Sequence, residues 1–266
     1  MIYDDLLASH LKYGTTKKDI LKRNSFFEVL ENVVIAPWWN VKMFEGHDVE
    51  ITKINEIVYN IRYQDIVFTF LQLKAIGAPV MIDCVLELGV SKCNNLLFLG
   101  SVGSLDEIIS IGDIVIPEYS ICGDGASRYL NDNLEDDFGQ KFYPDKQSNK
   151  RLIEICEGIC ATNEVKMHLV ANFSVDTIFT QFAHLDRILD MGSKVIEMET
   201  ASLFKAASIA KINACALLCV SDNTVVSKSL YSGITTIEHE YRHNVRYEAI
   251  PKIVFEYFKR CFIKES

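Results

Sequence analysis

Two carboxylates separated by one methionine are the most unusual chemical feature of the sequence. Glu197 and Glu199 flank Met198 within Val195-Ile-Glu-Met-Glu-Thr-Ala, where a predicted strand gives way to a predicted helix. Helix N-termini favour acidic residues, which explains one of the two carboxylates. The other acid still lies inside the strand, so we expect the two side chains to have different roles.

Two other segments place polar or small residues directly after apolar runs. Ser221-Asp222-Asn223 follows residues 214–220, and Gly100-Ser-Val-Gly-Ser104 follows residues 96–99. An acid at the end of a central strand is well placed for catalysis, although Ser, Asp and Asn are also common turn formers. The backbone amides and the Ser101 hydroxyl of the second segment suit an anion or a ring, but a plain tight turn explains that segment equally well.

The elements that must position these residues alternate between strands and helices. Strands are predicted at residues 32–36, 96–99, 113–116, 166–171, 194–198 and 214–220, with two or three more within 49–73. A capped helix is predicted in the segment Thr15–Arg23, and another at 148–161 with Ser148 as its cap. Further helices are predicted at 77–89, 182–191 and 199–211, and at 235–262 with a kink at Pro251. Residues 123–147 are predicted to form a long surface loop. This alternation indicates an α/β fold whose sheet is covered on both faces.

No repeat or flexible linker divides the chain, so we expect one domain, residues 1–266. Its predicted architecture is a single-domain, three-layer α/β/α sandwich around a mixed central sheet. Ligands of such sheets bind beyond the carboxyl ends of strands. Ser101, Glu199 and Asp222 follow different strands, and we therefore expect them to converge on one cleft.

Composition and charge exclude several classes of protein. The 266 residues carry 27 Lys and Arg against 36 Asp and Glu, a formal net charge of −9. So acidic a chain lacks the basic surface that binds nucleic acid or anionic membranes, although it can hold a small anion in a local basic pocket. An acidic N-terminus and the lack of apolar stretches near ~20 residues predict a cytoplasmic protein. Eight cysteines without a CxxC pair are expected to be reduced and mostly buried, with no metal site.

Seven short motifs run in order over nearly the whole chain. They are His10-Leu, Leu99-Gly-Ser-Val-Gly-Ser-Leu, Ile111-Gly-Asp-Ile-Val-Ile-Pro, Asp124-Gly-Ala-Ser, Ser174-Val-Asp-Thr, Val195-Ile-Glu-Met-Glu-Thr-Ala and Val220-Ser-Asp. In this order and spacing the sequence resembles the nucleoside phosphorylase/nucleosidase superfamily. That group holds purine nucleoside phosphorylases, uridine phosphorylases and methylthioadenosine nucleosidases.

The resemblance implies cleavage of a nucleoside N-glycosidic bond through a positively charged, oxocarbenium-like sugar. By match to the family's motifs, Glu199 would hold ribose hydroxyls and Met198 would pack under the sugar. Asp222 would be the general acid that protonates N7 of a leaving purine. That role requires burial to raise the pKa of the carboxyl, so that it keeps its proton.

The same match suggests residues for the base pocket and for a neighbouring subunit. Glu197, Phe179 and Ile178 fall where the family lines the base pocket, and Gly103 falls where backbone faces the base. His10 matches a histidine that reaches the ribose 5′ end of an adjacent subunit. The resemblance therefore implies a homo-oligomer, a homodimer or a trimer of dimers.

The phosphate site departs from the family pattern. Phosphorylases of the family carry a Pro-Gly-Asp-Pro-type turn followed by an arginine, and a second arginine just before the Gly-Ser/Thr loop. Here Trp38 stands in the glycine position, Lys42 roughly in the first arginine position and Phe98 in the second. Phosphate held by Lys42, Ser101 and the amides near Gly100 would have fewer donors than in relatives.

Three functions stay open at this point. The first is a phosphorylase with an altered phosphate site, which uses inorganic phosphate as co-substrate and no cofactor. The second is a nucleosidase that uses water, although Glu45 lies several residues after the position of that branch's water-activating glutamate. The third is a non-catalytic nucleoside-binding relative. Asp222 favours a purine substrate, because the uridine branch lacks this acid, whereas Asp124-Gly-Ala-Ser leans toward that branch.

Overall fold

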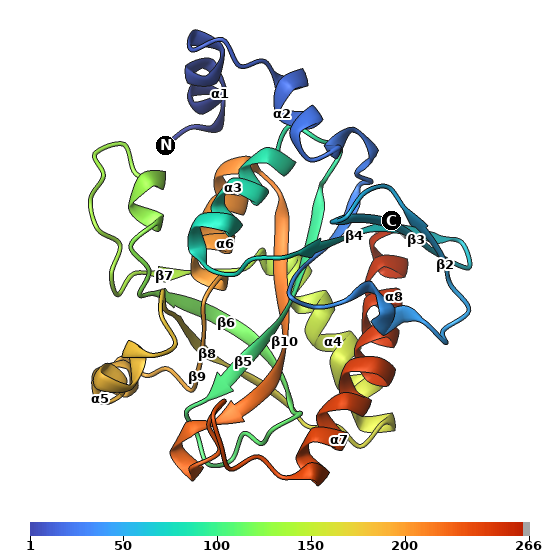
Figure 1. The fold of residues 1–266 in the computed structure, drawn as a ribbon, viewed down its shortest axis with the longest axis vertical. Coiled ribbons are helices and arrows are strands. Elements are labelled where there is room, and N and C mark those ends of the chain that lie inside the picture. Colours follow the sequence, from blue (N-terminus) through green and yellow to red (C-terminus); the bar gives the residue numbers. More distant parts are fainter. Residues whose placement is uncertain (263–266) are drawn as a thin grey trace.

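A mixed sheet forms the centre of the protein in a computed structural model that describes residues 1–262 (Figure 1). Its strands are β1 (Asn32–Pro37), β2 (Glu50–Lys53), β3 (Val58–Tyr63), β4 (Ile66–Leu73), β5 (Asn95–Ser104), β6 (Ile114–Cys122), β7 (Lys141–Phe142), β8 (Met167–Ser174), β9 (Val195–Glu197) and β10 (Asn213–Asn223). Parallel pairs such as β1 with β5 and antiparallel pairs such as β5 with β9 occur in the same sheet. The prediction of a mixed central sheet is confirmed.

The sheet closes on itself at one end. The strand order β10-β6-β8-β9-β5 is completed by a parallel pairing of β10 with β5, which makes a ring of five strands. Strands β1, β4, β3 and β2 continue outward from β5. This closure brings the ends of β5, β9 and β10 to one place, which the sequence pattern alone did not specify.

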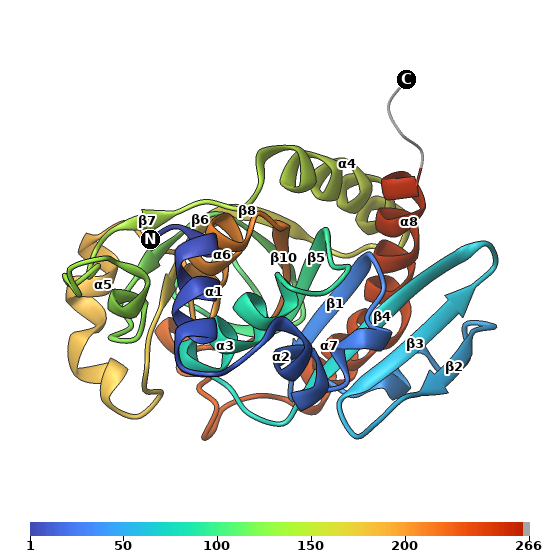
Figure 2. The ribbon, with the colours of Figure 1, turned by 90° about the horizontal axis from the view of Figure 1, so that it is seen from above.

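Helices cover both faces of the sheet (Figure 2). The α-helices are α1 (Tyr3–Lys12), α2 (Lys17–Arg23), α3 (Ala78–Leu88), α4 (Lys146–Thr162), α5 (Leu185–Asp190), α6 (Thr200–Ala210), α7 (Thr236–Asn244) and α8 (Ile250–Phe262). Short helical turns are η1 (Phe26–Glu28), η2 (Val41–Phe44), η3 (Ser127–Leu130), η4 (Thr180–His184), η5 (Thr224–Val226) and the π-helical η6 (Val245–Ala249). Buried Val85 of α3 and Leu203 of α6 share one apolar core, and Leu152 of α4 and Val254 of α8 share another.

Two predicted turns are strand instead, so that interpretation was wrong. Gly100 and Ser101 pair with Leu218 and Cys219 of β10, and Gly103 pairs with Ile196 of β9. Residues 221–223 likewise belong to β10. Small and polar residues remain in strand geometry here because both neighbouring strands supply hydrogen-bond partners along the backbone.

The C-terminal helix predicted at 235–262 is divided rather than simply kinked. A π-helical turn, η6, separates α7 from α8 and ends two residues before Pro251. Proline has no N–H and clashes with the preceding turn, which explains an irregularity at this position. The predicted loop 123–147 also contains η3 and β7, and Asp145, not Ser148, caps α4 by accepting a hydrogen bond from the Ser148 amide (2.8 Å).

Two further sequence expectations concern membranes and thiols. Among residues 1–262, no helix is both long enough and apolar enough to cross a membrane. All eight cysteines are free thiols, and seven of them are buried. They act as small apolar residues of the core.

Candidate active site

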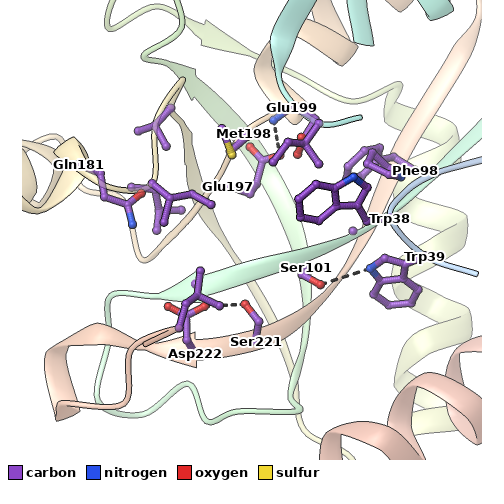
Figure 3. Close-up of a pocket in the computed structure, with 18 of the residues that line it drawn as sticks. Trp38, Trp39, Phe98, Ser101, Gln181, Glu197, Met198, Glu199, Ser221 and Asp222 are labelled. Carbon is purple, nitrogen blue, oxygen red and sulfur yellow. Dashed lines mark hydrogen bonds between the residues drawn. The ribbon is translucent and has the colours of Figure 1, made fainter. Parts of the chain in front are cut away.

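One cavity of about 310 Å³ lies at the ends of β5, β9 and β10. Ser101, Glu199 and Asp222 all line it, so the expected convergence of these residues is confirmed. In Figure 3, Glu199 and Met198 lie above the cavity, Asp222 lies below it, and Ser101 lies to the right. The closed ring of strands explains why residues 121 positions apart meet, since β5 pairs with both β9 and β10.

Asp222 is aimed into the cavity by a β-bulge. The register of β10 against β5 shifts between Val220 and Asp222, and such bulges redirect a side chain. Opposite lies Gly103, where an added Cβ would sit 3.2 Å from Asp222 Oδ2, so the glycine leaves room for the carboxyl. Burial raises the pKa of Asp222, although a hydrogen bond from Ser221 (2.6 Å) and the charge of Arg242 oppose the shift. A carboxyl of this kind can keep a proton and deliver it.

Glu199 is buried on the opposite wall, just before α6. Its Oε1 accepts a hydrogen bond from the backbone N–H of Gly77 (2.7 Å), which stands before α3 with a φ of 96° that favours glycine. Burial, and then the neighbouring charge of Glu197, raise the pKa of Glu199. Once ionised, above this raised pKa, the carboxylate has about four acceptor sites and retains capacity for ligand hydroxyls.

Glu197 lines the same cavity, but its oxygens are occupied. Oε2 accepts from the amides of Glu199 (2.7 Å) and Thr200 (2.8 Å), and Oε1 accepts from Asn172 Nδ2 (2.7 Å), Ser174 Oγ (2.5 Å) and Thr200 Oγ1 (2.9 Å). The carboxylate therefore satisfies the first amides of α6 and fixes the turn that presents Glu199. The network gives Glu197 a positioning role, and its contact with a base stays a prediction.

Replacing Glu197 by glutamine is expected to lower the free energy of unfolding by about 3 kcal/mol. The glutamine side chain replaces one acceptor oxygen by an NH₂ donor, which then faces the buried donors that bond to Glu197. Hydrogen bonds to a charged group contribute about 1.5–3 kcal/mol each. Denaturant unfolding of the variant measures the loss, with Glu157→Gln on the exposed side of α4 as the matched control. A change no larger than that of the control would show that this network does not stabilise the fold.

The predicted phosphate residues are only partly brought together. Gly100 and Ser101 line the cavity, as does buried Phe98, whose ring lies so close to Gly100 that a Cβ there would be 2.5 Å from it. Lys42 is exposed on η2 and is not one of the lining residues. Trp38 has a left-handed backbone, with a φ of 57°, and its indole N–H donates to the carbonyl of Lys74 (2.9 Å).

Two arginines that the sequence analysis did not single out lie at this end of the cavity. Arg242 Nη2 donates to Ser101 Oγ (3.0 Å), and the guanidinium of Arg246 lies 4.1 Å from the centre of the Trp39 ring. Both line the cavity and come from the α7–η6 region. Their spacing of four residues places them on one helix face, which is the signal that could have identified them.

The remaining predicted residues divide between the cavity and the surface. Met198 and Ile178 line the cavity, whereas the Phe179 side chain is 79% exposed and does not. Gln181, which was not predicted, lines the cavity and is 9% exposed, so its amide can both donate to and accept from a ligand. His10 is exposed on α1, outside this cavity.

Metal ligation finds no support in the described part of the chain. Within residues 1–262, no three His, Cys, Asp or Glu side chains are grouped so that they could hold a metal ion. The cavity instead combines three buried carboxyls, a pair of arginines and apolar walls. This donor set suits an organic ligand together with an anion.

The fold and the cavity define an α/β protein with a ligand site at the strand ends. Comparison with known protein families identifies the family to which it belongs. A family model described as the phosphorylase superfamily matches residues 63–245, more than half of the chain. The chain belongs to this superfamily of nucleoside phosphorylases and nucleosidases.

Individual relatives are distant. A DeoD-type purine nucleoside phosphorylase of an Exiguobacterium species is 27% identical over 158 residues, which are 59% of this chain and 63% of that protein's length. Uridine phosphorylase from Vibrio fischeri superposes with a TM-score of 0.71 at 18% identity, over 88% of this chain and 94% of that one. AMP nucleosidase from Bacteroides thetaiotaomicron superposes with a TM-score of 0.68 at 13% identity, over 92% of this chain and 97% of that one. At these identities, the two structures are similar to this chain in fold.

Proposed function

We propose that the protein cleaves the N-glycosidic bond of a purine nucleoside with phosphate, giving free base and ribose 1-phosphate. The observation that carries this proposal is the placement of Asp222 and Glu199 on opposite walls of one cavity. A carboxyl with a raised pKa suits proton donation to a leaving base, and a second carboxylate suits a sugar that becomes positively charged.

The proposed reaction breaks one bond and forms another at C1′ of the ribose. As the C1′–N9 bond breaks, its electrons pass into the purine, and Asp222 gives its proton to N7. A phosphate oxygen then forms the new bond to C1′. Glu199 accepts hydrogen bonds from the ribose hydroxyls and stabilises the positive charge of the sugar between these events, with Met198 against its face.

The rest of the proposal concerns the base pocket, the oligomeric state and the cellular compartment. Ile178 and the backbone of Gly103 would border the base, and the amide of Gln181 could pair with its edge. We also propose a homodimer or a trimer of dimers, in which exposed His10 completes a neighbour's ribose site. The reaction requires phosphate as co-substrate and no cofactor, and we propose that it takes place in the cytoplasm.

Base release measured with and without phosphate tests the proposed function. We expect purine nucleosides to release their base only when phosphate is present, and pyrimidine nucleosides to react more slowly. Equal rates without phosphate would make the protein a nucleosidase that uses water. Absence of release from every purine and pyrimidine nucleoside would make it a non-catalytic binding protein.

A further inference from the structure

Two positive charges face the cavity without a negative partner. Among residues 1–262, no carboxylate oxygen lies within 4.0 Å of a guanidinium nitrogen of Arg242 or Arg246. The Nε atoms of both side chains are buried and have no hydrogen-bond partner within that range. Buried polar groups normally have partners. Both side chains also line the cavity, so an anion bound there would meet two positive charges that no carboxylate neutralises.

The fold places these two like charges close together, although they repel each other. Residues four apart on a helix are neighbours, and like charges at this spacing repel. Burial, and then the charge of Arg242, lower the pKa of Arg246. Trp39 nevertheless fixes Arg246 by stacking, and Ser101 fixes Arg242 by a hydrogen bond. The nearby acid is Asp222, whose pKa is raised by burial, although the charge of Arg242 opposes this shift.

Ser101 adds a further donor at the same point. Its Oγ accepts hydrogen bonds from Arg242 Nη2 (3.0 Å) and from Trp39 Nε1 (3.3 Å). A hydroxyl that accepts two hydrogen bonds still has its own proton to donate. Two guanidinium groups and a hydroxyl proton are thus available to one ligand, and a tetrahedral oxyanion with several acceptor oxygens matches that set.

We propose that Arg242, Arg246 and Ser101 form the binding site for a phosphate dianion. In this site, guanidinium groups from the α7–η6 region take the place of the arginines that the chain lacks at Phe98 and near Lys42. The inference rests on the proposed function, because inorganic phosphate is then the anion consumed. The phosphoryl group of a nucleotide has the same chemistry, and the test separates the two sources.

The test is a calorimetric titration of the full chain with inorganic phosphate, without nucleoside. Loss of one charge-assisted contact, at about 1.5–3 kcal/mol, corresponds to roughly a 10–100-fold rise in Kd. We expect that rise for Arg246→Gln and Arg242→Gln, and a smaller one for Arg246→Lys, which keeps the charge but loses the planar fork. Exposed Arg62→Gln on β3 is the matched control and should leave Kd unchanged. Circular dichroism confirms that each variant is folded.

Each outcome bears on the site separately from the proposed function. Phosphate binding that survives both arginine substitutions but fails in Lys42→Gln would overturn this assignment and place the anion near η2. A wild-type chain that binds no phosphate would also overturn it, whereas base release decides independently whether phosphorolysis takes place. Adenosine 5′-monophosphate that binds tightly, competes with phosphate and loses affinity in Arg246→Gln would assign the site to a nucleotide's phosphoryl group instead of the free ion.

Discussion

Substitution of Asp222 by asparagine is expected to lower kcat for purine nucleosides by roughly 10²–10⁴-fold, the usual contribution of a positioned general acid. The amide keeps the shape of the side chain and can still accept a hydrogen bond from Ser221, but it cannot give a proton to the leaving base. Steady-state kinetics at saturating nucleoside and phosphate measure the effect. Asp65→Asn, in the exposed turn between β3 and β4, is the matched control.

The pH profile gives this prediction a second readout. Because burial raises the pKa of Asp222, the protonated form persists above the ordinary range of aspartate. Wild-type kcat should therefore fall as pH rises through that raised pKa, and Asp222→Asn should lack this decline. Unchanged kcat in the variant, or an unchanged decline, would move the proton donor away from β10.

Substitution of Glu199 by glutamine is expected to lower kcat/KM by roughly 10²-fold, which is the loss of about two hydrogen bonds to a charged acceptor. The neutral amide can keep the contact to Gly77, but it cannot balance the charge that develops on the sugar, as Glu199 does when it is ionised above its raised pKa. Kinetics with a purine nucleoside, and with Glu157→Gln as control, measure the loss. Equal kcat/KM in wild type and Glu199→Gln would remove Glu199 from the ribose site.

The stability of the wild-type protein should depend on pH through Glu199, and the same variant tests this. Because the pKa of Glu199 is raised in the folded state, that state binds more protons than the unfolded chain above the ordinary range of glutamate. Its contribution is complete at lower pH and is lost as pH rises through the raised pKa. Glu199→Gln should thus lose less thermal stability than wild type between pH 5 and pH 9.

The sequence pattern predicted the parts of the fold that depend on local residue types. Apolar runs identified the buried strands, and the expected capped helix is α2, with Thr16 as its N-cap. The pattern did not predict that β10 pairs with β5, because pairing depends on contacts between distant segments. For the same reason, the small residues 100–104 predict a turn, although partners on both sides hold them in β5.

The sequence predicted the site residues that directly follow strands. It did not predict those that the C-terminal helical region adds to the cavity. Ser101 and Asp222 stand at the ends of apolar runs, so their convergence followed from the geometry of a sheet. Arg242 and Arg246 lie in a segment whose pattern indicates only a helix. Whether their side chains point into the cavity depends on how α7 and η6 pack. The position of Lys42 in the chain predicts a phosphate ligand, but the turn of η2 leaves its side chain exposed.

The central claim is that phosphate attacks the sugar of a nucleoside bound between Asp222 and Glu199. Its most direct test is a reaction with phosphate in which all four oxygens are ¹⁸O, followed by mass analysis of the sugar product. The account predicts ribose 1-phosphate that retains all four labelled oxygens, because the new bond to C1′ is made by a phosphate oxygen. Free ribose without label, formed at a rate indifferent to phosphate, would contradict it.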